Sequence, residues 1–173
     1  MELAPQWRDF VEELCGDTYR DFICRLLEVS NVRFRFHWHF TPNGGEVSPH
    51  CDSKGKIGSQ IFYLNTDDDW DWSWGGETVI LDDKGRIAAD NAPAFEDFDA
   101  VYPAQTKDNR SILFGRRGNS WHGERRINCP ENYYRNVFIV VFEEYRALRM
   151  VVKKARRLLT GAELVTQKER LMY

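Results

Sequence analysis

The sequence has few of the features that mark secreted, membrane-spanning or nucleic-acid-binding proteins. Its four cysteines form no C-x-x-C pair and no dense framework, so we expect reduced thiols in a reducing compartment. The first residues, MELAPQWRDFVEEL, lack the basic start and apolar run of a signal peptide. The longest apolar run, VFIVVF, is far shorter than the about 20 residues that cross a bilayer. The net charge of -3 gives no electrostatic reason to expect nucleic acid. These absences predict a cytoplasmic protein without a membrane partner.

The length of 173 residues fits one domain, which we predict over residues 1–173. Residues 1–30 are expected to hold N-terminal helices, because Pro5 suits a first helical turn and apolar residues recur at helical spacing. Gly16 is expected to bend or interrupt this segment.

The last part of the chain, residues 143–173, is expected to hold a C-terminal helix. Apolar residues recur on one face between Glu144 and Leu159, and Gly161 suits the end of the helix. The opposite face is basic, which is typical of a solvated surface; binding to a partner or an anionic surface is the alternative.

Residues 31–142 are expected to form a mainly β core between the helices. The segments predicted as strands are 31–40, 56–65, 78–81, 86–89, 110–115 and 134–145. Segments 41–49, 66–77 and 82–85 are predicted as loops or turns, and 116–126 as the exit of the strand before it, whereas residues 90–109 carry little periodicity. Many short strands with such turns predict a double-stranded β-helix, a cupin-like jelly-roll barrel, with binding sites at its mouth.

The stretch VSPHCDSKG places His50 and Asp52 on either side of Cys51. On an extended segment, side chains at positions i and i+2 project to the same side. His50 and Asp52 can therefore share one metal ion, whereas Cys51 points away and packs.

A third ligand is expected from one of the other three histidines. His37 and His39 precede the motif on a predicted strand, whereas His122 in GNSWHGERR follows a strand and can return to the barrel mouth. Two histidines and one carboxylate with open positions favour Fe(II); zinc or manganese also suits these donor atoms.

Five short motifs occur in one order along the chain: HCD, IFYLN, GGET, SILFG with WHGE, and YRNVFIVVF. This order resembles the Fe(II)- and 2-oxoglutarate-dependent dioxygenases, closest to their prolyl 4-hydroxylase-like branch, over roughly residues 31–142. The resemblance implies hydroxylation of a C–H bond in a small metabolite or a peptide side chain, with release of succinate and CO2. It implies Fe(II), 2-oxoglutarate and O2 as cofactors, with ascorbate as a stimulating reductant.

The resemblance also implies roles for individual residues. His50, Asp52 and His122 would be the iron ligands, and Arg135 would bind the distal carboxylate of 2-oxoglutarate, with the Tyr63 hydroxyl on the same carboxylate. Independently of the resemblance, an arginine that heads an apolar strand needs a partner, and a planar guanidinium suits a carboxylate. An acidic side chain at the surface is the alternative partner for Arg135.

Two departures from the family pattern leave alternatives open. The interval between His122 and Arg135 is longer than usual, which makes Arg125 and Arg126 competing candidates for the distal carboxylate. Phe40 stands where relatives often carry a tyrosine that touches the co-substrate. The residues that remain for this contact are His39, Gln60 and Trp38.

Substrate contacts are expected from aromatic and basic side chains near the mouth. In the acidic loop DDDWDWSWGG, Trp70, Trp72 and Trp74 either close over substrate or cover the barrel wall. Trp121 either shields the iron or packs locally. Arg116 lies at the same edge and either faces an anionic substrate or belongs to the solvated surface.

Two other functions fit parts of the pattern. A non-catalytic metal-binding jelly roll, such as a sugar-binding or sensor domain, would bind a metal ion and ignore 2-oxoglutarate. A nucleic-acid demethylase on the same barrel is disfavoured by the acidic loop, because phosphate binding needs a basic stripe.

Overall fold

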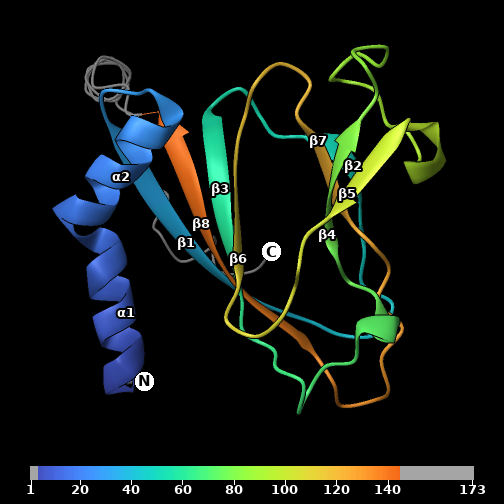
Figure 1. Cartoon of the computed structure of the whole chain (residues 1–173), viewed down its shortest axis with the longest axis horizontal. Helices are drawn as coiled ribbons and strands as arrows, with labels where there is room; N and C mark the ends of the chain where they lie inside the picture. The colour runs from blue at the N-terminus through green and yellow to red at the C-terminus, as the bar shows by residue number, and fades with distance from the viewer. Residues whose placement is uncertain (1–3, 145–173) are drawn as a thin grey trace, which may run out of the picture.

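The computed structural model describes residues 4–144, which form two helices and two four-stranded antiparallel sheets (Figure 1). The helices are α1 (Pro5–Cys15) and α2 (Asp17–Leu27). The first sheet, in spatial order, contains β1 (Val32–Thr41), β8 (Arg135–Glu144), β3 (Lys56–Tyr63) and β6 (Ser111–Gly115). The second contains β2 (Val47–Cys51), β7 (Trp121–Glu124), β4 (Thr78–Asp82) and β5 (Ala100–Pro103). Two short 3-10 helices, η1 (Trp72–Trp74) and η2 (Phe95–Asp97), lie in the loops.

This arrangement confirms the predicted mainly β, jelly-roll-like fold but not a closed barrel. Among residues 4–144, strand pairing stays within each sheet, so β1 and β6 remain edges of one sheet and β2 and β5 remain edges of the other. Closure requires edge strands to pair across the gap. The edge strands β5 and β6 are only 4 and 5 residues long, and neither pairs with a strand of the other sheet in residues 4–144.

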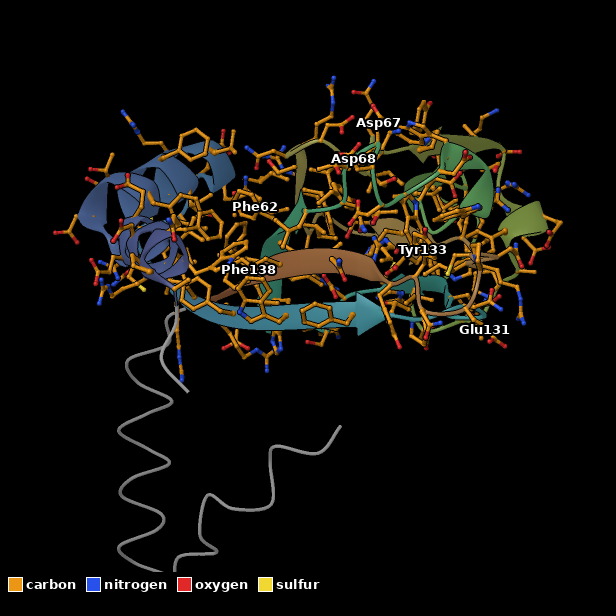
Figure 2. All side chains as sticks on the ribbon, turned by 90° about the horizontal axis from the view of Figure 1, so that it is seen from below. Phe62, Asp67, Asp68, Glu131, Tyr133 and Phe138 are labelled. Carbon is orange, nitrogen blue, oxygen red and sulfur yellow. The ribbon has the colours of Figure 1, made fainter. Side chains whose placement is uncertain are left out.

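The helices cover the outer face of the first sheet, on the side away from the second sheet (Figure 1). They are separate helices because the chain is extended at Gly16, which ends α1 and precedes α2, as the sequence predicted. Ile23 of α2 is fully buried against this sheet. In Figure 2, Phe62 and Phe138 lie next to the helices, and both belong to this helix-side core.

Strand β8 separates two cores through its alternating side chains. Phe138, Val140 and Phe142 pack on the helix side. Val137 and Ile139 face the second sheet, where they pack with Ile61 and Tyr63 of β3. The sequence predicted this division, and it places Arg135 on the inner face between the two sheets.

Several strand boundaries differ from the predictions. Residues 86–89 form a loop, because the buried Asp83 carboxylate accepts hydrogen bonds from the amides of Gly85 and Ile87 and curls the chain locally. Strand β4 pairs instead with β5, which lies within residues 90–109, where the sequence shows little periodicity. Strand β7 and the start of β2 were also predicted as loops, because each strand has only four or five residues and follows a stretch of turn residues.

The predicted C-terminal helix lies outside the described residues, apart from Glu143 and Glu144, which belong to β8. Among the helices in residues 4–144, none is long and apolar enough to span a membrane.

The packing of α2 gives a first prediction. Replacement Ile23→Ala should lower the free energy of unfolding by about 2–5 kcal/mol, because it leaves a cavity in the helix-side core. The neighbouring Leu26 is 47% exposed, so Leu26→Ala should change this free energy by less than about 1 kcal/mol. Urea unfolding followed by circular dichroism measures both, and equal losses would contradict the assigned helix face.

Candidate metal and anion site

The three predicted ligands meet on the inner face of the second sheet. His50 of β2 and His122 of β7 are register partners on adjacent strands, with ring centroids 4.3 Å apart. Asp52 follows β2 directly, and its Oδ2 lies 3.9 Å from Nε2 of His122. Each of the three residues contributes one donor atom, and these three atoms all lie within 4.8 Å of one another. The structure therefore brings the predicted triad together.

A β-bulge orients His50 toward the inner face. Between Val47 and His50 the register with β7 shifts by one residue, so that Val47 pairs with Glu124 and His50 with His122. An extra residue of this kind reverses the alternation of side chains on the bulged strand. Pro49, which has no N–H group to donate, lies within this irregular stretch and is buried.

Both imidazole rings are held in the tautomer that binds metals. Nδ1 of His50 lies 3.0 Å from the carbonyl oxygen of Ser48, and Nδ1 of His122 lies 3.1 Å from that of Ser120. A carbonyl oxygen only accepts, so each Nδ1 carries a proton, and in the neutral ring Nε2 keeps a free lone pair for a metal ion. Burial lowers the pKa of His122, and the proximity of His50 lowers it further, which favours the neutral ligand form.

Two cations hold Asp52 in place. Lys56 Nζ donates to Oδ1 at 2.6 Å, and Arg116 Nε donates to the Asp52 carbonyl oxygen at 2.8 Å. Lys56 therefore occupies one carboxylate oxygen, while Oδ2 faces His122. The Cys51 side chain packs with Val79 and Trp121 in a separate apolar cluster, which agrees with the prediction that it points away.

Arg135 lies on the same inner face with several polar neighbours. Its side chain is 3% exposed, and it pairs with Glu124 and donates to Thr78 Oγ1 at 3.1 Å. Its guanidinium carbon lies 5.5 Å from the ring centroid of Tyr63. Arg135 Nε and the Tyr63 hydroxyl are buried without a hydrogen-bond partner among residues 4–144. Thr78 and Arg135 lie near the Tyr63 hydroxyl and tend to lower its pKa, but neither meets hydrogen-bond geometry with it. Burial is the larger effect and raises the pKa of Tyr63 to about 12, so the hydroxyl keeps its proton and remains a donor.

The GGET motif explains how a loop approaches Arg135 closely. Gly76 has a φ of +79°, and a Cβ atom there would lie 3.0 Å from Arg135 Cδ and 2.9 Å from Ile127 Cγ1. Glycine alone combines this backbone conformation with the close contact.

The competing arginines lie elsewhere. The Arg125 guanidinium stacks over Phe95 at 4.6 Å, and Arg126 is 62% exposed and lies 3.8 Å from Glu46. Neither therefore replaces Arg135 on the inner face.

Trp38, Gln60 and His39, the candidates for the co-substrate contact that Phe40 cannot make, lie on two different faces of the first sheet. Trp38 packs on Trp7 of α1, and Gln60 accepts a hydrogen bond from Tyr19 of α2, so both lie on the helix side. His39 pairs with Val137, which in turn pairs with Tyr63. His39 is thus the candidate that shares the inner face with Tyr63.

The predicted substrate residues divide into two groups. Arg116 contacts Asp52 and lies beside the triad. Trp70 and Trp74 instead pack with Ile127 and Cys129, in the loop that leads to β8.

Trp72 and Trp121 lie in a hollow and in an apolar cluster, neither of which includes His50, Asp52 or His122. Trp72 and Trp74 line a hollow of about 280 Å³ together with Asp67, Asp68 and Tyr133, and Figure 2 shows these last three residues far from the helices. Trp121 is fully buried against Phe98, on the face of β7 opposite to His122.

Sequence reasoning missed three residues: Lys56, Thr78 and Glu124. The sequence contained a signal for Glu124, because this residue follows His122 by two positions and therefore lies on the same face of a strand. The sequence contained no such signal for Lys56 or Thr78, since their contacts depend on how the sheets and loops fold together.

The donor set gives a second prediction, tested with Co(II) as an air-stable optical probe. Asp52→Ala should weaken Co(II) binding by more than about 100-fold, because it removes a ligand rather than a supporting group. Cys51→Ser should leave the affinity unchanged, and the wild type should show no thiolate-to-cobalt absorption. A thiolate band that disappears in Cys51→Ser would contradict the assigned ligands.

Comparison with known proteins agrees with this geometry. The family model described as the 2OG-Fe(II) oxygenase superfamily matches residues 35–142, more than half of the chain. Among solved structures, a prolyl-4-hydroxylase from Pseudomonas putida is similar in fold, with a TM-score of 0.51 and 16% identity. The match covers 74% of this chain and 62% of that one.

No curated protein matches the chain. The family match confirms the membership predicted from the sequence and implies Fe(II), 2-oxoglutarate and O2 as cofactors. The chain belongs to the 2OG-Fe(II) oxygenase superfamily.

Proposed function

We propose that the protein is a 2-oxoglutarate-dependent dioxygenase that hydroxylates a C–H bond of a small metabolite or a peptide side chain. One observation carries this proposal: the His50, Asp52 and His122 donor group shares the inner face between the sheets with a buried arginine and a buried tyrosine hydroxyl that has no hydrogen-bond partner among residues 4–144. Succinate and CO2 are the expected co-products.

The triad suits Fe(II) as its metal. Two neutral imidazole nitrogens and one carboxylate form the facial set typical of non-haem iron oxygenases, and they leave coordination positions open. The carbonyl groups of Ser48 and Ser120 fix the rings, and Lys56 and Arg116 fix the carboxylate, so little rearrangement is needed on binding.

The surroundings of Arg135 suit the distal carboxylate of 2-oxoglutarate. Arg135 Nε and the Tyr63 hydroxyl are two buried donors that a carboxylate would satisfy. Glu124, the partner of Arg135, follows His122 by two residues on β7, which is about 7 Å along a strand. This separation suits a five-carbon dicarboxylate with one end at the metal and the other at Arg135.

Fe(II) with 2-oxoglutarate and O2 would supply the oxidant for the C–H bond. The protein's own residues hold the donors and exclude water. Phe114 packs on His122 at 4.7 Å between ring centroids, and Ile61 and Val137 line the same interior. Arg116, half-buried beside Asp52, is the residue we propose to face an anionic group of the substrate.

One observation favours the alternative of a metal-binding jelly roll without oxygenase activity. Arg135 is already paired with Glu124, as in a purely structural ion pair. A structural pair, however, gives no role to the Tyr63 hydroxyl or to Arg135 Nε, neither of which has a hydrogen-bond partner in the described part of the chain. The two functions differ in whether the protein binds 2-oxoglutarate.

Anaerobic titration with Fe(II) and then 2-oxoglutarate tests the proposal. The wild type should develop a saturable visible charge-transfer band. Arg135→Ala should weaken 2-oxoglutarate binding by roughly 10- to 100-fold, because it removes a charged hydrogen-bonding partner. Arg135→Lys, which retains the charge opposite Glu124 but loses the planar fork, should have an intermediate effect.

The exposed Arg126 provides the matched control, and Arg126→Ala should bind 2-oxoglutarate like the wild type. In air, succinate formation should depend on Fe(II) and be lost in His50→Ala. Iron binding without any band in the wild type would instead favour the metal-binding jelly roll.

A further inference from the structure

Arg135 already has an anionic partner from its own chain. Glu124 pairs with one terminal nitrogen of the guanidinium, and Thr78 accepts from the other at 3.1 Å. Only Nε remains without a partner in the described residues. An incoming carboxylate therefore meets an arginine whose two terminal nitrogens are both engaged.

The charges make joint occupation unfavourable. Arg135 and Glu124 together are neutral, so a second carboxylate placed against the guanidinium would lie close to the Glu124 carboxylate. Like charges in a partly buried site repel strongly, because the surrounding medium screens them less than water does. Glu124 must then leave the guanidinium for a ligand carboxylate to bind there with full strength.

Glu124 has a route by which it can leave. Its side chain is 18% exposed, whereas that of Arg135 is 3% exposed. Its backbone is fixed, because β7 lies between β2 and β4 and Glu124 pairs with Val47 on one side and Thr78 on the other. The movement available to Glu124 is thus a rotation of its side chain toward solvent, without displacement of the strand that carries His122.

We propose that Glu124 is an internal competitor for the co-substrate site. This inference rests on the proposed function, since it assigns Arg135 to the distal carboxylate. Glu124 holds Arg135 in the absence of ligand, and the distal carboxylate replaces it on binding. Arg135 Nε and the Tyr63 hydroxyl then donate to the ligand. Glu124 thereby weakens binding of dicarboxylates and sets the 2-oxoglutarate concentration that the protein requires.

Glu124→Gln tests the competition, because glutamine keeps the shape of the side chain and removes its charge. This variant should bind 2-oxoglutarate at least tenfold more tightly in the anaerobic Fe(II) titration, about 1.4 kcal/mol. Pyruvate, a 2-oxo acid without the distal carboxylate, should bind the variant and the wild type equally. A general change in packing would alter both ligands, whereas competition alters only the dicarboxylate.

Glu46→Gln is the matched control. Glu46 lies 3.8 Å from Arg126 at the surface, so the same chemical change there should leave affinity for both ligands unchanged. If Glu124→Gln does not fold, Glu124→Asp decides, because a shorter side chain reaches Arg135 less well and should tighten 2-oxoglutarate binding by a smaller factor.

The outcomes separate the two proposals. If the wild type forms the 2-oxoglutarate band and the Glu124 variants bind equally or more weakly, the competition is refuted and the oxygenase proposal stands. If neither the wild type nor the variants form a band with 2-oxoglutarate, the proposed function fails. If the Glu124 variants bind 2-oxoglutarate more tightly and pyruvate as the wild type does, both proposals are supported.

Discussion

Strand β8 lies between β1 and β3, and its alternating side chains are the constraint on which the rest of the fold depends. One face supplies the aromatic residues that the helices cover, and the other supplies Arg135, Val137 and Ile139 to the space between the sheets. A slip of one residue in its register would turn the arginine to the helix-side face and direct aromatic rings into the space between the sheets. The long pairing with β1 over ten residues on each strand fixes this register.

The inner face combines two ion pairs of different character. At one end, Lys56 holds a carboxylate that is also suited to bind a metal, so the cation and the metal ion can occupy different oxygens of Asp52. At the other end, Glu124 and Arg135 pair with each other, and a ligand carboxylate would compete for the same guanidinium. Breaking a buried pair is costly unless a new partner replaces the lost one. The first pair is therefore compatible with a loaded site as it stands, whereas the second must rearrange.

The sequence predicted those parts of the protein that follow from local pattern. The alternation along 135–142 correctly predicted which side chains face each core. The spacing within the H-x-D motif correctly predicted that His50 and Asp52 lie close together. Strands β5 and β7 escaped prediction because each has only four residues, too few for a period to be recognised. The partnership of Arg135 with Glu124 also escaped prediction, because it joins residues on different sheets and depends on how those sheets face each other.

The bulge in β2 determines whether the donor atoms that face the site are nitrogen and oxygen or the softer sulfur. Without the extra residue, regular alternation from Val47 would direct Pro49 and Cys51 inward, and His50 would face the outer cluster. A thiolate would then replace an imidazole near His122, and soft sulfur ligands favour zinc or copper(I) over Fe(II). A single inserted backbone position thus gives the site a nitrogen and oxygen donor set, which would suit Fe(II), and turns an oxidisable thiol away from it.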